Sequence, residues 1–445
     1  MGQSIFNHNL FNLPRHGYFM AVLQVALDFM ILERAIKAAE EAIRGGADWL
    51  EAGTPLIKSE GMKAIRELKR RFHRITVADL KTMDVGRVEV EMAAKSGADI
   101  ITVLGVADDS TIEDSIKAAR KYGAKIMVDL LNHPEPVKRA KEVEKLGADY
   151  ICVHVGVDQQ MLGKNPLEVL RDVARNVEIP VAAAGGINSE SAADVVNAGA
   201  EIVIVGGAII KAPDVEDATR KIKEAIEKRK KIKSELYKKY GEEELREAFM
   251  KVSTPNLSDA MHRKNALGNF IKLGGNKIVG RAVTVKTLNG DWAKPVEAID
   301  YAEPGDVIVI DAGDGKVAVW GELATWSCKI KGIGGVVIYG AARDVDEIKK
   351  MDYPVFTRHI APNAGEPKGF GEINVELEIE GVKIRPGDWI IGDDSGIVVV
   401  PKERAVEIAN RAIDVMEHEN RIRGEIKRGG TLSSVIKLED WEVER

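Results

Sequence analysis

Short apolar runs alternate with amphipathic stretches through the first half of the chain. Eight such runs lie between residues 20 and 213, and helical repeats such as Leu32–Ile43 and Thr111–Tyr122 separate them. The runs are Val22–Leu27, Trp49–Glu51, Ile75–Ala78, Ile100–Val103, Ile126–Val128, Tyr150–His154, Pro180–Ala184 and Ile202–Val205. Strands that alternate with helices pair in parallel, and eight units favour a closed (β/α)8 barrel over an open doubly wound sheet.

A tripeptide repeat marks the same periodicity. Gly-Ala-Asp, or Gly-Ala-Glu in the last copy, begins at Gly46, Gly97, Gly147 and Gly199, and each copy directly precedes an apolar run. The spacing of about 50 residues is near the length of two βα units. Glycine often follows the last turn of a helix, where a left-handed backbone is needed. We therefore expect each of these glycines to end a helix.

The second half of the chain has a different pattern. Ser253-Thr254-Pro255 predicts a helix start, and short β runs separated by Pro-Gly-Asp turns follow it. These runs are Val279–Val285, Asp306–Ile310, Val317–Trp320, Val336–Tyr339 and Ile397–Val400. The mixture of helices and short strands predicts a second, separate α/β domain.

The segment between the two halves is rich in Lys, Glu and Ile. Arg220–Lys239 contains neither Gly nor Pro, which predicts that the last barrel helix runs on into a charged helical linker. A basic nucleic-acid-binding run is the alternative, but Glu224, Glu227 and Glu235 interleave with the basic residues. The predicted organisation is a tail at 1–19, a TIM barrel at 20–213, a helical linker at 214–250 and an α/β domain at 251–445.

The composition of the chain argues against two classes of partner, nucleic acids and membranes. The 445 residues are 45% hydrophobic and 30% charged, with a net charge of −6, which argues against a nucleic-acid partner held by phosphate contacts. No apolar run is long enough to span a membrane, so no membrane partner is expected. Both cysteines, Cys152 and Cys328, lie in apolar runs. We therefore expect buried thiols and a cytoplasmic protein.

Ionisable residues gather where the predicted strands end. In a barrel of this kind the carboxyl ends of the strands carry the chemistry, and here they place Asp28, Glu51, Asp79, Lys81, Asp129 and His154 at one rim. Glu51 and Asp79 follow neighbouring strands and offer the oxygen ligands that suit Mg²⁺. At a strand end, His154 favours a proton-transfer role over that of a satisfied core histidine.

Asp79 and Lys81 are two residues apart at the end of the third run. In an extended segment such residues point the same way, so the two side chains are expected side by side. Asp84 lies past the turn, from where it reaches back to its own site or across to a partner chain. A surface salt bridge is the alternative for the Asp79–Lys81 pair.

Two glycine pairs end the seventh and eighth runs. Gly185-Gly186 follows Ala184, and Gly206-Gly207 follows Val205. Glycine lets backbone N–H groups approach a phosphate closely, which predicts a phosphate-binding end of the site. Simple turn chemistry is the alternative.

The motif Asp79-x-Lys81-x-x-Asp84 resembles that of the orotidine-monophosphate decarboxylase suprafamily. Together with Thr102–Gly105, Val153–Gln159 and the two glycine pairs, it makes residues 20–212 look specifically like the 3-hexulose-6-phosphate synthase family.

The related 3-keto-gulonate-6-phosphate decarboxylases usually carry Arg shortly after the histidine and in the last phosphate loop. This chain has Gly156 and Gly207 at those places, which favours the synthase and leaves the decarboxylase as the alternative.

The resemblance implies aldol addition of formaldehyde to ribulose 5-phosphate, which gives 3-hexulose 6-phosphate, and the reverse cleavage. It implies Mg²⁺ (or Mn²⁺) held by Glu51 and Asp79, where the metal stabilises an enediolate as a Lewis acid. By the same resemblance Lys81 adds positive charge and His154 is the acid/base.

Two further roles follow from that resemblance. Asp28 is expected to hydrogen-bond the hydroxyl groups of the substrate. In the suprafamily the last Asp of the motif acts across a dimer interface, so Asp84 is expected to complete the site of a partner barrel in a homo-oligomer.

Residues 251–405 resemble the ribonuclease-activity regulator A / 4-hydroxy-4-methyl-2-oxoglutarate aldolase family. The likeness rests on Gly321-Glu322-Leu323, Ile338–Asp344 and Gly392–Pro401. It implies that Gly321, Glu322 and Leu323 line a site for a small oxo-acid, with Arg343 catalytic and Asp344 a metal ligand. The alternative is a non-catalytic, ribonuclease-regulator-like binding module in which Arg343 and Asp344 form an internal salt bridge.

Overall fold

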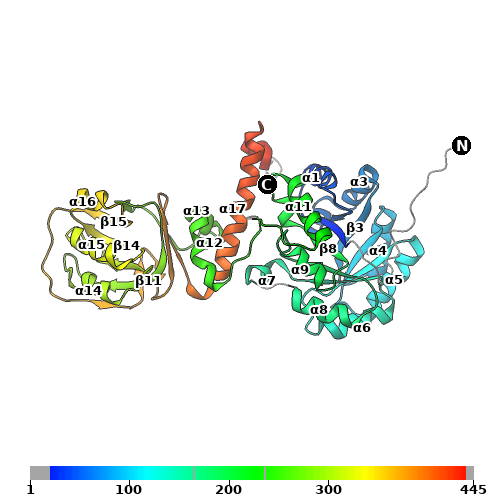
Figure 1. The fold of residues 1–445 in the computed structure, drawn as a ribbon, viewed down its shortest axis with the longest axis horizontal. Helices are drawn as coiled ribbons and strands as arrows, with labels where there is room; N and C mark the ends of the chain where they lie inside the picture. The colour runs from blue at the N-terminus through cyan, green and yellow to red at the C-terminus, as the bar shows by residue number, and fades with distance from the viewer. Residues whose placement is uncertain (1–20, 164–165, 235–236, 437–445) are drawn as a thin grey trace, which may run out of the picture. The chain divides into compact units, whose positions relative to one another are not determined.

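A computed structural model describes residues 21–163, 166–234 and 237–436 (Figure 1). Within these ranges the chain forms two compact units. The first comprises residues 21–160, 166–234, 237–239 and 417–436, and the second comprises 161–163 and 240–416. The predicted tail, residues 1–19, lies outside the described residues.

The first unit contains the predicted closed barrel of eight parallel strands, in the order β1 to β8. The strands are β1 Val22–Leu27, β2 Trp49–Ala52, β3 Ile75–Thr82, β4 Ile100–Leu104, β5 Lys125–Asp129, β6 Tyr150–His154, β7 Val181–Ala184 and β8 Ile202–Val205. The helices are α1 Leu32–Arg44, α2 Thr54–Glu60, α3 Lys63–Phe72, α4 Gly86–Lys95, α5 Asp109–Tyr122, α6 Pro136–Leu146, α7 Val157–Met161, α8 Leu167–Asn176, α9 Ala192–Asn197, α10 Gly207–Ile210 and α11 Val215–Lys228. Helices surround the strands in Figure 1.

Burial on both faces explains why the strands are continuous apolar runs. Every residue of β1 and of β8 is buried, with one face toward the helices and the other toward the barrel interior. Inside the barrel, the rings of Trp49 and Tyr150 meet edge to face with centroids 6.0 Å apart. Both residues begin their strands, so they fill the amino end of the barrel and leave the carboxyl end to the site.

The repeated glycines have the backbone that their position predicts. Gly46, Gly97, Gly147 and Gly199 have φ values of 102°, 101°, 99° and 111°. A side chain would be strained in this region, whereas glycine is not. Each glycine lets the chain leave a helix and turn into the following strand, which confirms the expectation from the repeat.

The linker corrects one prediction, because no continuous helix runs to Lys239. Helix α11 ends at Lys228, and Arg229 takes a left-handed φ of 49°. The N–H of Ile232 then donates to the carbonyl of Ser189 at 3.0 Å, and the Ser189 hydroxyl donates to the Ile232 carbonyl at 2.7 Å. These bonds tie the segment to the loop after β7, and they override its helical composition.

The second unit is the predicted α/β domain, built on a mixed sheet in the order β10-β15-β14-β12-β11-β19-β20-β9. The strands are β9 Ala266–Leu267, β10 Ile271–Lys272, β11 Ile278–Lys286, β12 Val307–Asp311, β13 Ala318–Trp320, β14 Gly335–Ala342, β15 Val355–Ile360, β16 Glu372–Ile373, β17 Leu377–Ile379, β18 Val382–Ile384, β19 Trp389–Asp393 and β20 Gly396–Val400. The helices are α12 Leu245–Lys251, α13 Thr254–Ala260, α14 Ala293–Tyr301, α15 Glu322–Lys331, α16 Val345–Lys350 and the first part of α17 Ala405–Lys427.

Local signals account for several of these elements. Ser253 caps α13, where its hydroxyl accepts the N–H of Asn256, as the Ser-Thr-Pro start predicts. Strands β11, β12, β14 and β15 pair in parallel, and β19 and β20 add to the sheet in antiparallel fashion.

The end of the chain corrects the predicted boundary of the second domain. Residues 417–436, which include the last part of α17 and α18 (Leu432–Ile436), belong to the first unit. There the Glu417 carboxylate accepts the N–H of Tyr237, and Glu425 pairs with Arg34 of α1 at 2.9 Å. Contacts with residues far earlier in the chain therefore decide where this segment belongs.

Two smaller findings bear on the sequence predictions. Cys152 and Cys328 are buried free thiols, as expected. No helix in the described ranges has both the length and the apolar character needed to cross a membrane.

Candidate active site

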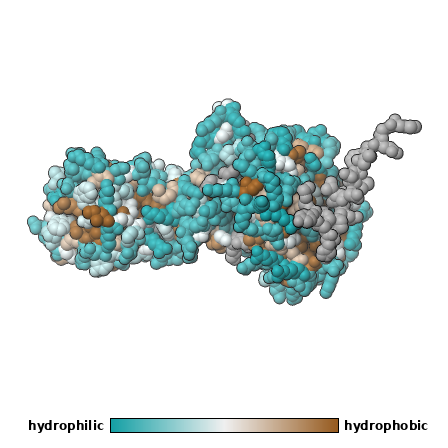
Figure 2. Space-filling view, viewed as in Figure 1, coloured by the Kyte–Doolittle hydropathy of each residue, from teal (hydrophilic) through white to brown (hydrophobic). Residues whose placement is uncertain are grey.

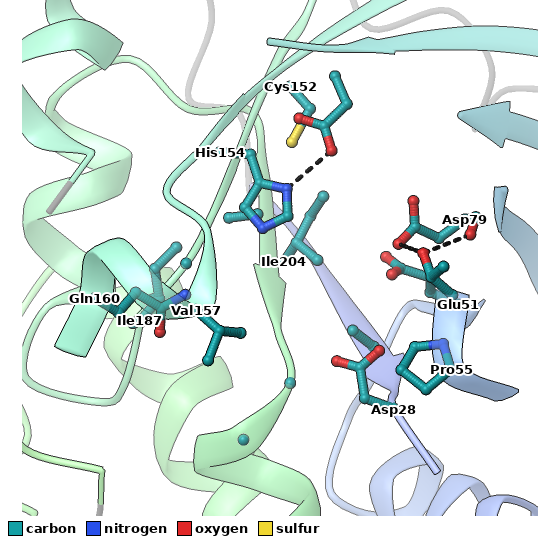
Figure 3. A pocket seen from close by; sticks show the side chains of 18 of the residues that line it. Asp28, Glu51, Pro55, Asp79, Cys152, His154, Val157, Gln160, Ile187 and Ile204 are labelled. Carbon is teal, nitrogen blue, oxygen red and sulfur yellow. Dashed lines mark hydrogen bonds and ion pairs between the residues drawn. The ribbon is translucent and has the colours of Figure 1, made fainter. Parts of the chain in front are cut away.

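A pocket of about 420 Å³ opens at the carboxyl end of the barrel strands. Residues in or directly after all eight strands line it, as the closed barrel predicts. Figure 3 shows Asp28, Glu51 and Asp79 on one side of this pocket, with His154 facing them. The structure thus brings together five of the predicted site residues: Asp28, Glu51, Asp79, Lys81 and His154.

Asp79 is held from three directions. Its Oδ2 accepts the Thr54 hydroxyl at 2.8 Å and the Lys81 ammonium at 2.5 Å, while its Oδ1 accepts the Thr102 hydroxyl at 2.7 Å. The side chain is buried. A carboxylate with this many donors is fixed in one orientation before any ligand binds.

The predicted closeness of Asp79 and Lys81 is confirmed, although a regular strand does not produce it. The pairing of β3 with β4 shifts register between Ala78 and Thr82, and Lys81 has a left-handed φ of 50°. The bulge turns the Lys81 side chain into the pocket, where it also lies 3.6 Å from Asp129. Because both acids are buried, the surface salt bridge is not the arrangement found.

The charges around Lys81 fix its protonation. Burial alone lowers the pKa of this ammonium, but the charges of Asp79 and Asp129 outweigh burial and raise it above its ordinary value. Lys81 is therefore a permanent cation in the pocket. It suits charge stabilisation rather than proton transfer.

His154 forms a pair with Asp129. Its Nδ1 lies 2.8 Å from Oδ2 of Asp129. Burial lowers the pKa of His154, but the Asp129 carboxylate more than offsets this and the pKa is raised. Burial raises the pKa of Asp129, but the His154 and Lys81 charges lower it further than burial lifts it. The pair leaves Nε2 of His154 for a ligand in the pocket.

Asp28 and Glu51 carry negative charge that the protein only partly compensates. Burial and the charges of Asp79 and Asp28 raise the pKa of Glu51 well above its ordinary value, although Gln24 donates to Oε2 of Glu51 at 2.5 Å. Asp28 keeps solvent-accessible surface within the pocket, yet surrounding protein and the Asp79 charge raise its pKa also. The charges of Lys81 and Lys211 oppose the rise in the pKa of Asp28, and Lys81 also opposes that of Glu51, but neither offsets it.

The donor set of this cluster fits a hard divalent cation. Mg²⁺ commonly binds one or two protein carboxylates and completes its shell with water and substrate oxygens. Glu51 and Asp79 supply two such carboxylates, and a cation there would relieve the repulsion that raises the pKa of Glu51. Across the described residues, no three His, Cys, Asp or Glu side chains form a metal cage by themselves.

The two glycine pairs, which follow β7 and β8, also line the pocket. Gly185 and Gly186 have φ values of 105° and 68°, and a side chain at Gly185 would clash with the Val155 backbone. A Cβ at Gly206 would lie 3.1 Å from Oδ2 of Asp28. These positions favour glycine, because a side chain would strain the backbone at Gly185 and Gly186 and would crowd Asp28 at Gly206.

Sequence reasoning missed several pocket residues. Thr54 and Thr102 orient Asp79, Gln160 and Lys211 line the cavity near the glycine loops, and Tyr237 enters it from the linker. Threonine, glutamine and tyrosine are common in any fold, so no local signal marks them. Lys211 does have a sequence signal, because it is a cation only four positions after Gly207 in the last glycine pair.

Asp84 does not join the pocket of its own chain. It is exposed, and its Oδ1 accepts the N–H of Val85 at 2.7 Å. Apolar side chains around it are exposed as well: Met83 52%, Val85 56%, Val88 47% and Met92 45%. An acid of the motif therefore stands on an exposed apolar surface.

The second unit contains a pocket of about 510 Å³ that gathers its predicted residues. Gly321, Glu322, Leu323, Arg343 and Asp344 all line it. This arrangement brings the start of α15 together with the turn that follows β14.

The charged pair of this second pocket is partly exposed. Nε of Arg343 lies 3.5 Å from Oδ2 of Asp344, and that oxygen also accepts the N–H of Glu322 at 3.2 Å. Their side chains are 45% and 38% exposed, and the internal salt bridge of the alternative interpretation is present. The pair remains open to a ligand.

Apolar side chains are exposed on the two helices that contribute Val296 and Leu323 to the second pocket. On α15 and α14, Leu323 is 75% exposed, Ile330 82%, Trp326 44% and Val296 37%. Figure 2 shows hydrophobic side chains gathered on the face where α14 and α15 lie. A surface of this kind marks a contact site.

The fold and the first site define a TIM-barrel enzyme. Residues 21–222 match the model of the orotidine 5'-phosphate decarboxylase / HUMPS family. The 3-hexulose-6-phosphate synthase of Bacillus subtilis is 42% identical over 206 residues, which cover 46% of this chain and 98% of the relative. By its barrel the chain belongs to this family.

The second unit is an RraA-like domain. Residues 254–399 match the model of the Aldolase/RraA family. The solved structure of the RNA-processing inhibitor RraA of Thermus thermophilis is 28% identical, with 34% of this chain and 93% of that chain covered and a TM-score of 0.32.

A solved structure of a 3-hexulose-6-phosphate synthase is 39% identical to this chain. The match covers 46% of this chain and 99% of that chain, with a TM-score of 0.44.

Proposed function

We propose that the barrel catalyses the Mg²⁺-dependent aldol addition of formaldehyde to D-ribulose 5-phosphate, which gives 3-hexulose 6-phosphate, and the reverse cleavage. The observation that carries this proposal is the cluster of Lys81, Asp79 and the His154–Asp129 pair at one rim. The identity of 42% to a synthase, over almost the whole length of that relative, supports the same reaction. The corresponding physiological roles are formaldehyde fixation through the ribulose monophosphate pathway in the forward direction and pentose phosphate synthesis in the reverse direction.

The chemistry requires a proton to leave C1 of ribulose 5-phosphate, next to the C2 carbonyl. C1 of the resulting enediolate attacks the formaldehyde carbon and forms a C–C bond. The C2 carbonyl re-forms, and the oxygen of the former formaldehyde takes up the proton. Neutral His154, held through Nδ1 by Asp129, offers Nε2 to accept and return the proton. Lys81 supplies a fixed positive charge for the enediolate.

The remaining groups hold the substrate. A divalent metal bound by Glu51 and Asp79 would stabilise negative charge on the enediolate oxygens. Asp28 faces the pocket and accepts substrate hydroxyl groups. The glycine loops and Lys211 form the end that takes the phosphate.

The barrel acts as a homodimer with shared sites. Asp84 is exposed and stands among exposed apolar side chains, which supports its placement at an interface. Across that interface Asp84 completes the site of the partner. Two free buried thiols support a cytoplasmic location.

One assay tests the barrel proposal. Purified full-length protein is given ribulose 5-phosphate and formaldehyde, with and without Mg²⁺, and loss of formaldehyde is followed. Metal-dependent formation of 3-hexulose 6-phosphate supports the proposal. Release of CO₂ from 3-keto-gulonate 6-phosphate, without aldol activity, would instead favour the decarboxylase.

For the RraA-like domain we propose a metal-dependent lyase that acts on a small oxo-acid. Its support is the pocket in which Arg343 and Asp344 lie together with the start of α15. Arg343 binds the carboxylate of the oxo-acid through two parallel hydrogen bonds, and the carboxylate of Asp344 is a ligand for a Mg²⁺ or Mn²⁺ ion. The test supplies oxaloacetate or a 4-hydroxy-2-oxo acid with either metal and measures pyruvate. No turnover and no metal-dependent oxalate binding would leave a binding module.

A further inference from the structure

Tyr237 lines the barrel pocket although it does not belong to the barrel. It lies in the segment after α11, outside residues 21–222 that match the family model. Its side chain is buried and packs with the hydrophobic core of the barrel. A residue of the linker therefore forms part of the wall of the active-site pocket.

Hydrogen bonds hold this segment against the loop after β7. Besides the two bonds between Ile232 and Ser189, the N–H of Ser234 donates to Oε1 of Glu190 at 2.7 Å. The backbone carbonyl of Tyr237 accepts a hydrogen bond from Nδ2 of Asn188 at 3.5 Å, and the backbone N–H of Tyr237 donates to the Glu417 carboxylate. The backbone on both sides of the ring is thus fixed, and the ring has a defined place.

The ring of Tyr237 occupies the space that a side chain at Gly207 would need. A Cβ at Gly207 would lie 2.7 Å from the Tyr237 hydroxyl oxygen and closer still to two ring carbons. The hydroxyl end of the ring therefore lies over the last glycine loop. Gly207 and Tyr237 are complementary, and an arginine at position 207 is incompatible with this ring.

Cations lie at the same end of the pocket. Nζ of Lys211, which also lines the pocket, is 5.7 Å from the ring centroid, and Nζ of Lys239 is 4.4 Å from it. A phenol hydroxyl beside ammonium groups and glycine backbone suits a multiply charged anion, which accepts several hydrogen bonds at once.

We propose that Tyr237 is a substrate-binding residue that donates its hydroxyl hydrogen to the phosphate of the sugar substrate and closes that end of the pocket. This inference rests on the proposed function of the barrel and names a residue that the barrel alone does not supply. In this chain the linker completes the phosphate end.

The test compares the Tyr237→Phe variant with the unsubstituted protein. Tyr122→Phe, a matched change on α5 away from the pocket, is the control. Loss of one hydrogen bond to a charged group raises KM for ribulose 5-phosphate by about tenfold. The inhibition constant of inorganic phosphate rises by the same factor, while kcat and KM for formaldehyde stay within about twofold. An unchanged KM and inhibition constant in a folded Tyr237→Phe variant would overturn the proposal.

A second measurement separates this inference from the proposed function. Calorimetric titration with inorganic phosphate needs no turnover, so weaker binding in Tyr237→Phe upholds the phosphate contact even if synthase activity is absent. A double-mutant cycle with Gly207→Ala and Tyr237→Ala completes the test. Because the added Cβ meets the ring, Gly207→Ala weakens phosphate binding in the native background more than in Tyr237→Ala, whereas equal effects count against the contact.

Discussion

The imidazole of His154 and the carboxylate of Asp129 form a buried pair, with Nδ1 and Oδ2 2.8 Å apart. They end strands β6 and β5, and Lys81 lies 3.6 Å from the same carboxylate. Asp129 thus orients the ring and sets its tautomer, which leaves Nε2 toward the pocket. Because each partner shifts the pKa of the other, the protonation of this pair is coupled to the stability of the folded protein.

We predict that this pair makes the stability of the protein depend on pH. Because Asp129 raises the pKa of His154 above 6.5, the imidazolium stabilises the fold fully below 6.5 and loses this effect as the pH rises through the raised pKa. The pKa of Asp129 is lowered from 3.8, so its contribution is present above 3.8 and is lost as the pH falls through the lowered value. Both contributions are complete between these two values.

His154→Gln should therefore lower the free energy of unfolding by on the order of 1 to 3 kcal/mol more at about pH 5.5 than at about pH 9. Denaturant unfolding at the two pH values measures the difference. His73→Gln, an exposed position on the barrel, is the matched control. Equal losses at both pH values would show that the pair is not charged in the folded protein.

Asp79→Asn should abolish synthase activity and leave the fold intact. The amide oxygen can still accept from Thr54 and Lys81, but the amide nitrogen cannot accept from Thr102, and the substitution removes the negative charge that a metal needs. We expect kcat to fall roughly 100-fold or more, with an unchanged circular dichroism spectrum. Asp114→Asn, an exposed change on α5, should keep normal turnover. Near-normal activity of a folded Asp79→Asn would refute the role of this carboxylate.

Metal binding can be tested without turnover. Free Mn²⁺ in solution, measured by electron paramagnetic resonance, reports the affinity of the barrel for the ion. Glu51→Gln removes one proposed ligand and should raise the dissociation constant at least roughly tenfold, since the remaining site has a single carboxylate ligand. Glu113→Gln on the surface of α5 serves as the control. If both variants bind Mn²⁺ equally, Glu51 is not a ligand.

Shared sites predict complementation between inactive variants. In a hybrid of Asp84→Ala and Lys81→Ala subunits, one of the two sites contains native Lys81 and native Asp84. Random mixing should therefore restore about a quarter of the native activity. Subunit exchange is verified with differently tagged chains. Proven exchange without recovered activity would place Asp84 outside the site of its partner.

In the second unit, Arg343→Ala should remove oxo-acid turnover while the barrel keeps its activity. The guanidinium is the cation that lines this pocket beside Asp344, so its loss should lower pyruvate release about 100-fold or more. Arg404→Ala, an exposed change near the start of α17, is the matched control. Synthase activity, measured in parallel, verifies that the chain is folded.

Much of the barrel can be predicted from local sequence. A strand buried on both faces is a continuous apolar run, and β1 begins and ends at the residues that its run predicts. Because all parallel strands of a barrel end at one rim, the positions of Asp28, Glu51 and His154 also follow from the chain order. The closeness of Asp79 and Lys81 is likewise local, since they are only two positions apart in the chain.

The remaining features depend on contacts between distant parts of the chain. The composition of Arg220–Lys239 favours a helix, but hydrogen bonds to Ser189 and Glu190 end it, and periodicity contains no information on such partners. The placement of Tyr237 over Gly207 and the grouping of 417–436 with the barrel have the same origin. Local propensity decides which segments become strands and helices, whereas closure of the fold decides which side chains share a pocket.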